Sequence, residues 1–182
     1  MIAPNGRFTT YYLNGGGPPF LTSSFSGFGT TIISPTCEVQ AGRRNISVDF
    51  GNIPNSSFSG VGSKAINRDF DINLSCQGGS EAAYQSRISV RLDGEQDGSN
   101  MPGMLKLSAV DNSATRIGIQ IVRREGSAEH EVRFGQDINI GTTSVANSVL
   151  TLPLRARYVQ TQAGAVGGGA ANGTATFTIT YN

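Results

Sequence analysis

The sequence contains no tryptophan, one histidine and two cysteines, and only 15% of its 182 residues are charged. It also holds 24 glycines and little of the Ala, Glu, Lys and Leu mixture of long helices, which excludes an all-helical protein or a coiled coil. A formal net charge of +1 produces no strong field, so nucleic acid and anionic membranes are not expected as partners. The hydrophobic residues lie in short clusters, so most of the chain is expected to fold.

The residue types that catalytic and metal sites need are scarce. A Ser/His/Asp or Cys/His catalytic set would have to use His130, which we interpret as a solvated residue of an edge strand. One imidazole and two cysteines do not make a metal cluster. A calcium loop starting at Asp93 would need a glutamate at its twelfth position, where Met104 stands. The sequence therefore predicts no catalytic residue, no metal site and no cofactor, and the protein is not expected to be an enzyme.

The two cysteines, Cys37 and Cys76, each stand beside a segment of alternating apolar residues. Such a pair can join two strands of an exported β-domain, closing a loop of about 39 residues worth roughly 4 kcal/mol; the alternative is two buried free thiols. The first residues have neither a basic nor an apolar signal-peptide region, and no apolar run is long enough to cross a membrane. A disulfide would then imply a mature form or a fragment of a longer exported protein.

Short segments with apolar residues at every second position recur about every ten residues, as in β-sandwiches. In one of them Ile72, Leu74 and Cys76 fall on one face, whereas polar residues fall on the other. With no convincing helix between them, these segments predict antiparallel sheets packed face to face. A short helical turn near residues 52–58 is weakly indicated. The candidate strands are residues 30–39, 45–51, 68–76, 86–94, 103–111, 116–123, 130–141, 148–161 and 174–182.

The N-terminal residues 1–22 differ from the rest of the chain. They are interrupted by Gly-Gly-Gly-Pro-Pro at residues 15–19, which a regular element would not cross. We interpret them as a tail, a linker or the remnant of an upstream domain, with a short strand possible at residues 7–13. Residues 23–182 are expected to form one domain.

The C-terminal segment has the most regular alternation in the sequence. Ala175, Phe177, Ile179 and Tyr181 alternate with threonines up to Asn182. Ordinary domains end in a frayed polar tail, so a strand this regular either presents an edge to a partner or is a central strand that happens to be last.

Several stretches together resemble the subunits of bacterial chaperone–usher fimbriae, the pilin family. They occur in the family's order from about residue 25 to residue 182, with Gly169 fourteenth from the end as in the family's C-terminal motif. The matching stretches are SGFGTTIISPTCEV with Cys37, NISVDFGNI, FDINLSC with Cys76, ATRIGIQI, LPLRARYVQT and ATFTITYN with its penultimate Tyr181.

The resemblance implies an incomplete immunoglobulin-like β-sandwich, a pilin fold that lacks its final strand, with Cys37 and Cys76 joined oxidatively. It also implies donor-strand complementation, in which a periplasmic pilus chaperone and then a neighbouring fimbrial subunit supply the missing strand. The outer-membrane usher would be a further partner, and the protein would reach the fimbrium on the bacterial surface through the periplasm. Cationic chaperone residues would hold the terminal carboxylate. The implied chaperone and donor-strand interface comprises Gly169, Ala175, Phe177, Ile179, Tyr181 and Asn182.

One departure from the family bears on the role in the fibre. A polymerising pilin usually carries an alternating donor segment directly before its first strand, whereas here residues 15–19 intervene. We therefore favour the C-terminal pilin domain of a tip adhesin, which would mediate cell adhesion by binding a host glycan receptor through an upstream domain. The alternative is a polymerising major or minor pilin. A free-standing secreted carbohydrate-binding sandwich is a remote alternative, because tryptophan is absent and no sugar-stacking platform is evident.

Overall fold

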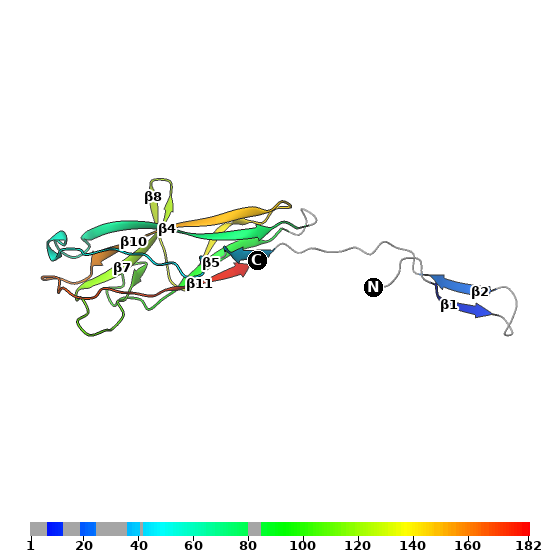
Figure 1. Cartoon of the computed structure of the whole chain (residues 1–182), viewed down its shortest axis with the longest axis horizontal. Helices are drawn as coiled ribbons and strands as arrows, with labels where there is room; N and C mark the ends of the chain where they lie inside the picture. Colours follow the sequence, from blue (N-terminus) through cyan, green and yellow to red (C-terminus); the bar gives the residue numbers. More distant parts are fainter. Residues whose placement is uncertain (1–6, 13–18, 25–35, 41, 80–84) are drawn as a thin grey trace. The chain divides into compact units, whose positions relative to one another are not determined.

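A computed structural model describes residues 7–12, 19–24, 36–40, 42–79 and 85–182. The chain divides into two compact units, Met1–Ile33 and Ser34–Asn182. In the first unit, β1 (Arg7–Tyr12) pairs antiparallel with β2 (Pro19–Ser24) (Figure 1). Strand β1 confirms the strand predicted at residues 7–13, whereas β2 was not predicted. It begins at the last proline of the predicted interruption, a position where the missing N–H of proline is tolerated.

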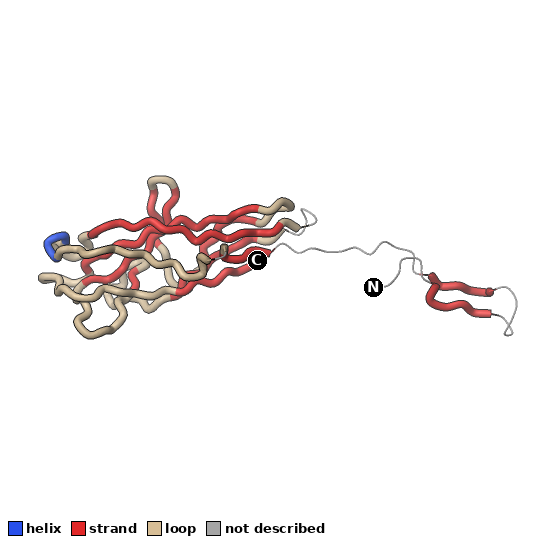
Figure 2. Tube along the Cα trace, in the orientation of Figure 1, coloured by secondary structure: helices blue, strands red, loops and turns tan. Residues whose placement is uncertain are grey.

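The second unit is an all-β sandwich of two antiparallel sheets, as the alternation predicts (Figure 2). Its larger sheet has the order β3-β4-β10-β7-β6, with β8 paired to β7, and its smaller sheet has the order β11-β5-β9. The strands of the larger sheet are β3 (Thr36–Val39), β4 (Lys64–Gln77), β6 (Met104–Leu105), β7 (Ile117–Glu125), β8 (Ala128–Glu131) and β10 (Ser148–Gln160). Those of the smaller sheet are β5 (Arg87–Asp93), β9 (Asp137–Thr142) and β11 (Thr176–Tyr181).

The core fills the space between these sheets with the residues that alternation assigns to it. Ile72 and Leu74 of β4 and Val90 of β5 are at most 1% exposed, and they pack in one cluster with Leu152 and Leu154 of β10. The predicted helical turn is the 3-10 helix η2 (Asn55–Ser57). None of the helices in the described ranges has both the length and the apolar character to span a lipid bilayer.

Three strand predictions differ from the structure. Residues 45–51 join no ladder, residues 103–111 supply only the two-residue β6, and residues 130–141 divide into β8 and β9. Alternation reports which side chains face the core, whereas a strand also needs a backbone partner. Between β8 and β9 the chain leaves the larger sheet for the smaller one through a turn at Gly135, whose φ is +78°. The early part of the predicted strand at residues 30–39 lies outside the described residues.

A cluster of charged side chains on the larger sheet holds the β7–β8 hairpin, which projects from the sheet (Figure 1). Arg155 of β10 binds Asp69 of β4 at 2.6 Å and Glu129 of β8 at 2.9 Å. Glu129 also binds the buried Arg157 at 2.8 Å, and Arg124 lies 3.3 Å from Asp69. The hydrogen bond from Arg155 lowers the pKa of Asp69, and the hydrogen bond from Arg157 lowers the pKa of Glu129.

These two carboxylates are expected to make the domain less stable in acid. Because their pKa values are lowered in the folded state, their contribution is complete above the ordinary carboxyl pKa of about 4 and is lost as the pH falls through the folded-state values. The double variant Asp69→Asn, Glu129→Gln should therefore lose less free energy of unfolding between neutral pH and about pH 3 than the wild type. Urea unfolding at several pH values measures this. Asp111→Asn, at an exposed site outside the cluster, is the control, and equal slopes for the wild type and the double variant would contradict the prediction.

Candidate functional site

The C-terminal strand β11 lies at the edge of the smaller sheet, where the part of the chain that the structure describes gives it β5 as its one partner. Phe177 pairs with Leu92 and Ile179 with Val90. Beyond the strand, the peptide groups of Asn182 and Arg87 exchange two hydrogen bonds of 2.9 Å. Hydrogen-bonded and non-hydrogen-bonded pairs alternate along an antiparallel ladder. The N–H and C=O groups of Phe177 and Ile179 therefore point away from β5, toward the open edge.

Beside this edge is a cavity of about 600 Å³ between the two sheets. Ala175 and Phe177 line one wall, and residues 45–50 line the other with Ile46, Val48 and Phe50. The core residues that line the cavity between the walls are mostly aliphatic, so the cavity is an apolar one. They are Phe70, Ile72, Leu92, Leu105, Ile119, Ile121 and Ala156.

A second cavity of about 740 Å³ adjoins the first and shares Asn45, Ile46, Val48, Phe50, Ile119 and Gly173 with it. It continues along residues 166–173 and has a more polar lining, which includes Asn45, Asn52, Asn55 and Asn172. We call the two adjoining cavities the β11 groove. Its apolar part lies next to β11 and its polar part lies next to the glycine-rich residues 167–169.

The wall opposite β11, residues 45–51, explains the failed strand prediction. Ile46, Val48 and Phe50 pack against the core as alternation predicts, and the Phe50 ring lies 4.4 Å from that of Tyr158. Arg68 donates a hydrogen bond from Nε to the carbonyl oxygen of Asp49 at 2.9 Å. Within the described ranges, however, residues 45–51 make no backbone–backbone hydrogen bond. Both walls of the groove thus present unpaired peptide groups.

The structure brings some of the predicted interface residues to the groove and places others at its margins. Ala175 and Phe177 line the apolar part. Ile179 packs against the core cluster but does not line either cavity. The N–H and C=O groups of Asn182 are hydrogen-bonded to the backbone of Arg87.

Gly169 lies at the polar end of the groove, where the chain's own backbone leaves no room for a side chain. Its φ is +148°, and a Cβ there would stand 2.1 Å from the carbonyl oxygen of Asn112. The next residue, Ala170, donates a backbone hydrogen bond of 2.8 Å to the same oxygen. A glycine at this position therefore lets residues 167–170 pack closely against the loop that contains Asn112.

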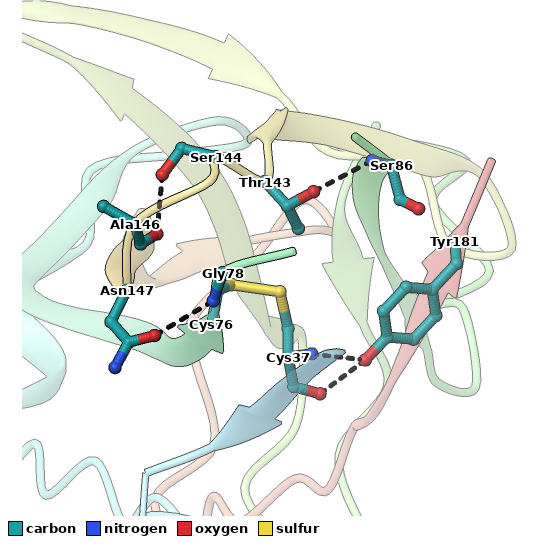
Figure 3. The surroundings of a disulfide bond; sticks show 9 residues. All are labelled: Cys37, Cys76, Gly78, Ser86, Thr143, Ser144, Ala146, Asn147 and Tyr181. Carbon is teal, nitrogen blue, oxygen red and sulfur yellow. Dashed lines mark hydrogen bonds between the residues drawn. A yellow bond between two sulfur atoms is a disulfide. The ribbon is translucent and has the colours of Figure 1, made fainter. Parts of the chain in front are cut away.

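The remaining predicted residues meet at the end of β11. Cys37 of β3 and Cys76 of β4 form a disulfide, and neither is a free thiol. The Tyr181 hydroxyl accepts a hydrogen bond of 2.9 Å from the Cys37 N–H and donates one to the Cys37 carbonyl oxygen (Figure 3). Sequence reasoning missed this contact because the two residues are 144 positions apart and no local pattern connects them. It also missed residues 45–51 as a groove wall, although their alternation was the available signal.

In the described part of the chain, the residue types that enzymes use lie apart from one another. His130 on β8 is an exposed edge-strand residue, as predicted, and lies 3.2 Å from Glu125. Among the residues that the structure describes, no three His, Cys, Asp or Glu side chains are placed to hold a metal ion. The features that stand out are therefore an open strand edge and the apolar groove beside it.

Comparison with known proteins identifies the family of this domain. A sequence model described as "Fimbrial protein" matches residues 27–182. The chain belongs to the fimbrial protein family. Fimbrial proteins are the subunits of chaperone–usher pili on the cell surface, and the family is structural rather than enzymatic. The all-β, two-sheet fold of this fimbrial subunit, with its one disulfide, is the pilin fold that its resemblance to pilins implied.

Three fimbrial proteins show the extent of the similarity. The chain is 34% identical over 166 residues to a "Type-1 fimbrial protein subunit" of Serratia marcescens, covering 88% of this chain and 86% of that protein. It is 33% identical over 160 residues to a "Fimbria adhesin protein" of Klebsiella pneumoniae, covering 86% of this chain but 47% of the adhesin. The crystal structure of the CupB6 tip adhesin from Pseudomonas aeruginosa matches with 29% identity and a TM-score of 0.59, covering 92% of this chain and 41% of the adhesin. The chain thus spans less than half the length of these two adhesins.

Proposed function

We propose that this fimbrial subunit receives a β-strand from another protein in the β11 groove. The observation that carries the proposal is the open edge of β11 beside an apolar cavity of about 600 Å³. A strand added at such an edge gains backbone hydrogen bonds, while its alternate side chains enter the cavity. The added strand would lie between β11 and residues 45–51, and would complete the hydrogen bonding of both walls.

The partners that fit this role follow from the family. A periplasmic pilus chaperone supplies the strand first, and a neighbouring fimbrial subunit replaces it during assembly at the outer-membrane usher. Covering the apolar lining before assembly keeps an exposed edge from pairing with unrelated strands.

Within the fibre we assign this chain to the C-terminal pilin domain of a tip adhesin. Its alignment with about half of the Klebsiella adhesin supports this assignment, as does the lack of an alternating donor segment before β3. In that role a host glycan would be bound by an upstream domain. One observation speaks for the alternative, a polymerising subunit: the match covers 86% of the length of the Serratia subunit. A peptide of residues 1–22 that occupied the groove of a second copy would support the alternative.

Amide hydrogen exchange tests strand addition residue by residue. In a complex with a periplasmic pilus chaperone, the amides of Phe177 and Ile179 should exchange about 100-fold more slowly than in the free chain, because their outward N–H groups gain partners. The amide of Thr178 is the internal control. Its N–H faces Arg91 of β5 by the register of the ladder, so it should be protected already and change little. Equal protection of all three amides in the free and bound chain would contradict the proposal.

A further inference from the structure

Tyr181 connects the two sheets at one end of the β11 groove. Its backbone belongs to β11 and pairs with Ile88 of β5, whereas its hydroxyl reaches Cys37 of β3 in the larger sheet (Figure 3). The hydroxyl serves as acceptor and donor at once, for the Cys37 N–H and the Cys37 C=O respectively. Cys37 is itself fixed to Cys76 by the disulfide. A covalent bond and two hydrogen bonds thus join β11, β3 and β4 at this point.

The peptide groups that Tyr181 binds are those on the open edge of β3. Cys37 stands opposite Cys76 with a Cα–Cα distance of 4.0 Å, which marks a non-hydrogen-bonded pair of the ladder. The Gln40 N–H donates to the carbonyl oxygen of Asn73 on β4, so the even-numbered residues of this segment face β4. Cys37 and Val39 therefore turn their N–H and C=O groups away from β4, toward the same side as the groove.

The two outward-facing residues of β3, Cys37 and Val39, have different surroundings. Val39 lines the apolar cavity, whereas the peptide groups of Cys37 are occupied by the Tyr181 hydroxyl. On the opposite wall the lining by β11 ends at Phe177, and neither Ile179 nor Tyr181 lines a cavity. The cavity lining therefore ends before the Tyr181–Cys37 contact on both walls: at Val39, next to Cys37 among the outward-facing residues of β3, and at Phe177 on β11, with Ile179 between it and Tyr181.

We propose that Tyr181 is a positioning residue that closes the β11 groove and sets where an incoming strand stops. This inference rests on the proposed strand-accepting function and deepens it. A strand in the groove can pair with β11 near Phe177 and with β3 near Val39, but pairing at Cys37 would require it to displace the hydroxyl. Two hydrogen bonds would be lost for two gained, so a longer strand gains no affinity there. The register of the strand is thereby fixed at one end.

Removing only the hydroxyl should open this end. In Tyr181→Phe the ring stays while the N–H and C=O of Cys37 become free, so a longer strand gains two backbone hydrogen bonds, or about tenfold in affinity. The amide of Cys37 in the free variant should exchange about tenfold faster than in the wild type. Tyr158→Phe is the matched control. It removes a tyrosine hydroxyl that donates to the carbonyl oxygen of Ala171 at 2.8 Å and should leave the exchange of the Cys37 amide unchanged.

The experiment uses two synthetic peptides of alternating valine and threonine with terminal lysines, of about six residues and about twelve residues. Affinity is measured by calorimetry and amide exchange by NMR, with the full chain and with Tyr181→Phe. We expect the wild type to bind both peptides equally. The variant should bind the longer peptide more tightly, and this peptide alone should slow the exchange of its Cys37 amide again. If the hydroxyl has only a structural role, the Cys37 amide should exchange faster in the free variant, and the longer peptide should not slow this exchange again.

Two results would overturn the inference, and they are distinguishable. If the peptides slow the exchange of the Phe177 and Ile179 amides but the variant does not discriminate between them, the stop at Tyr181 is wrong and strand addition stands. If neither peptide slows the exchange of these amides in the wild type, the strand-accepting function itself fails, and the stop fails with it.

Discussion

Replacing Phe177 with aspartate is expected to abolish strand capture by the β11 groove, lowering affinity at least about 100-fold. Phe177 lines the apolar cavity and packs against the core cluster of the sandwich. A carboxylate there would be enclosed with the added strand among aliphatic side chains, and such desolvation costs several kcal/mol without a compensating partner. The measurement is co-purification with a periplasmic pilus chaperone, followed by titration of the isolated chain with a strand peptide.

The next residue supplies the matched control for this prediction. Thr178 is exposed on the opposite face of β11, so Thr178→Asp places the same charge one position away without entering the groove. Its affinity should stay within about twofold of the wild type. Phe177→Ala, which leaves a smaller apolar side chain, should have an intermediate effect and shows whether the aspartate acts through charge. Equal capture by Phe177→Asp and Thr178→Asp would contradict the assignment of the groove.

Removal of the disulfide should have the largest effect on stability. In the double variant Cys37→Ala, Cys76→Ala the free energy of unfolding should fall by about 4 kcal/mol, because the unfolded chain is no longer closed into a loop of 39 residues. This is a large share of the 5–15 kcal/mol that is typical of a folded domain. Strand β3 has only four residues, so without the cross-link it would be held by a short ladder and by Tyr181.

Urea unfolding of the wild type and the double variant measures the loss. Reduction of the wild type is the control, since it should lower stability to about the level of the double variant without changing any residue. Because Tyr181 binds the backbone of Cys37 rather than its sulfur, the variant should keep this contact wherever β3 stays paired. A loss below about 1 kcal/mol would show that the disulfide adds little to the constraint already set by the strands.

The alternation of apolar residues in the sequence predicted which positions of the sheets are buried. Leu74 and Val90 are fully buried in strands whose alternating pattern assigned them to the core. The pattern could not decide whether a segment finds a backbone partner. Residues 45–51 alternate as well as β5 does, yet they join no ladder in the described part of the chain. Hydrogen-bond partners come from distant parts of the chain, so a local pattern does not specify them.

The candidate site was predicted in its residue types but not in its geometry. The regular alternation of the C-terminal segment left open an edge strand or a central strand, and in the described part of the chain β11 is an edge strand. The resemblance to pilins implied a strand-accepting interface at this segment, and two cavities lie beside it in the structure. It did not indicate that Phe177 lines the cavity while Ile179 packs against the core without lining either cavity.

The sequence by itself determined which side chains face inward, because a period of two residues is a local property of the strand. It also determined that residues 174–182 alternate like a strand and that the two cysteines could join neighbouring strands. Only the tertiary structure decided that the groove has unpaired peptide groups on both walls and that Tyr181 occupies those of Cys37. These features require segments up to 144 residues apart to be brought into register, and that register is set by the packing of the two sheets around a common core.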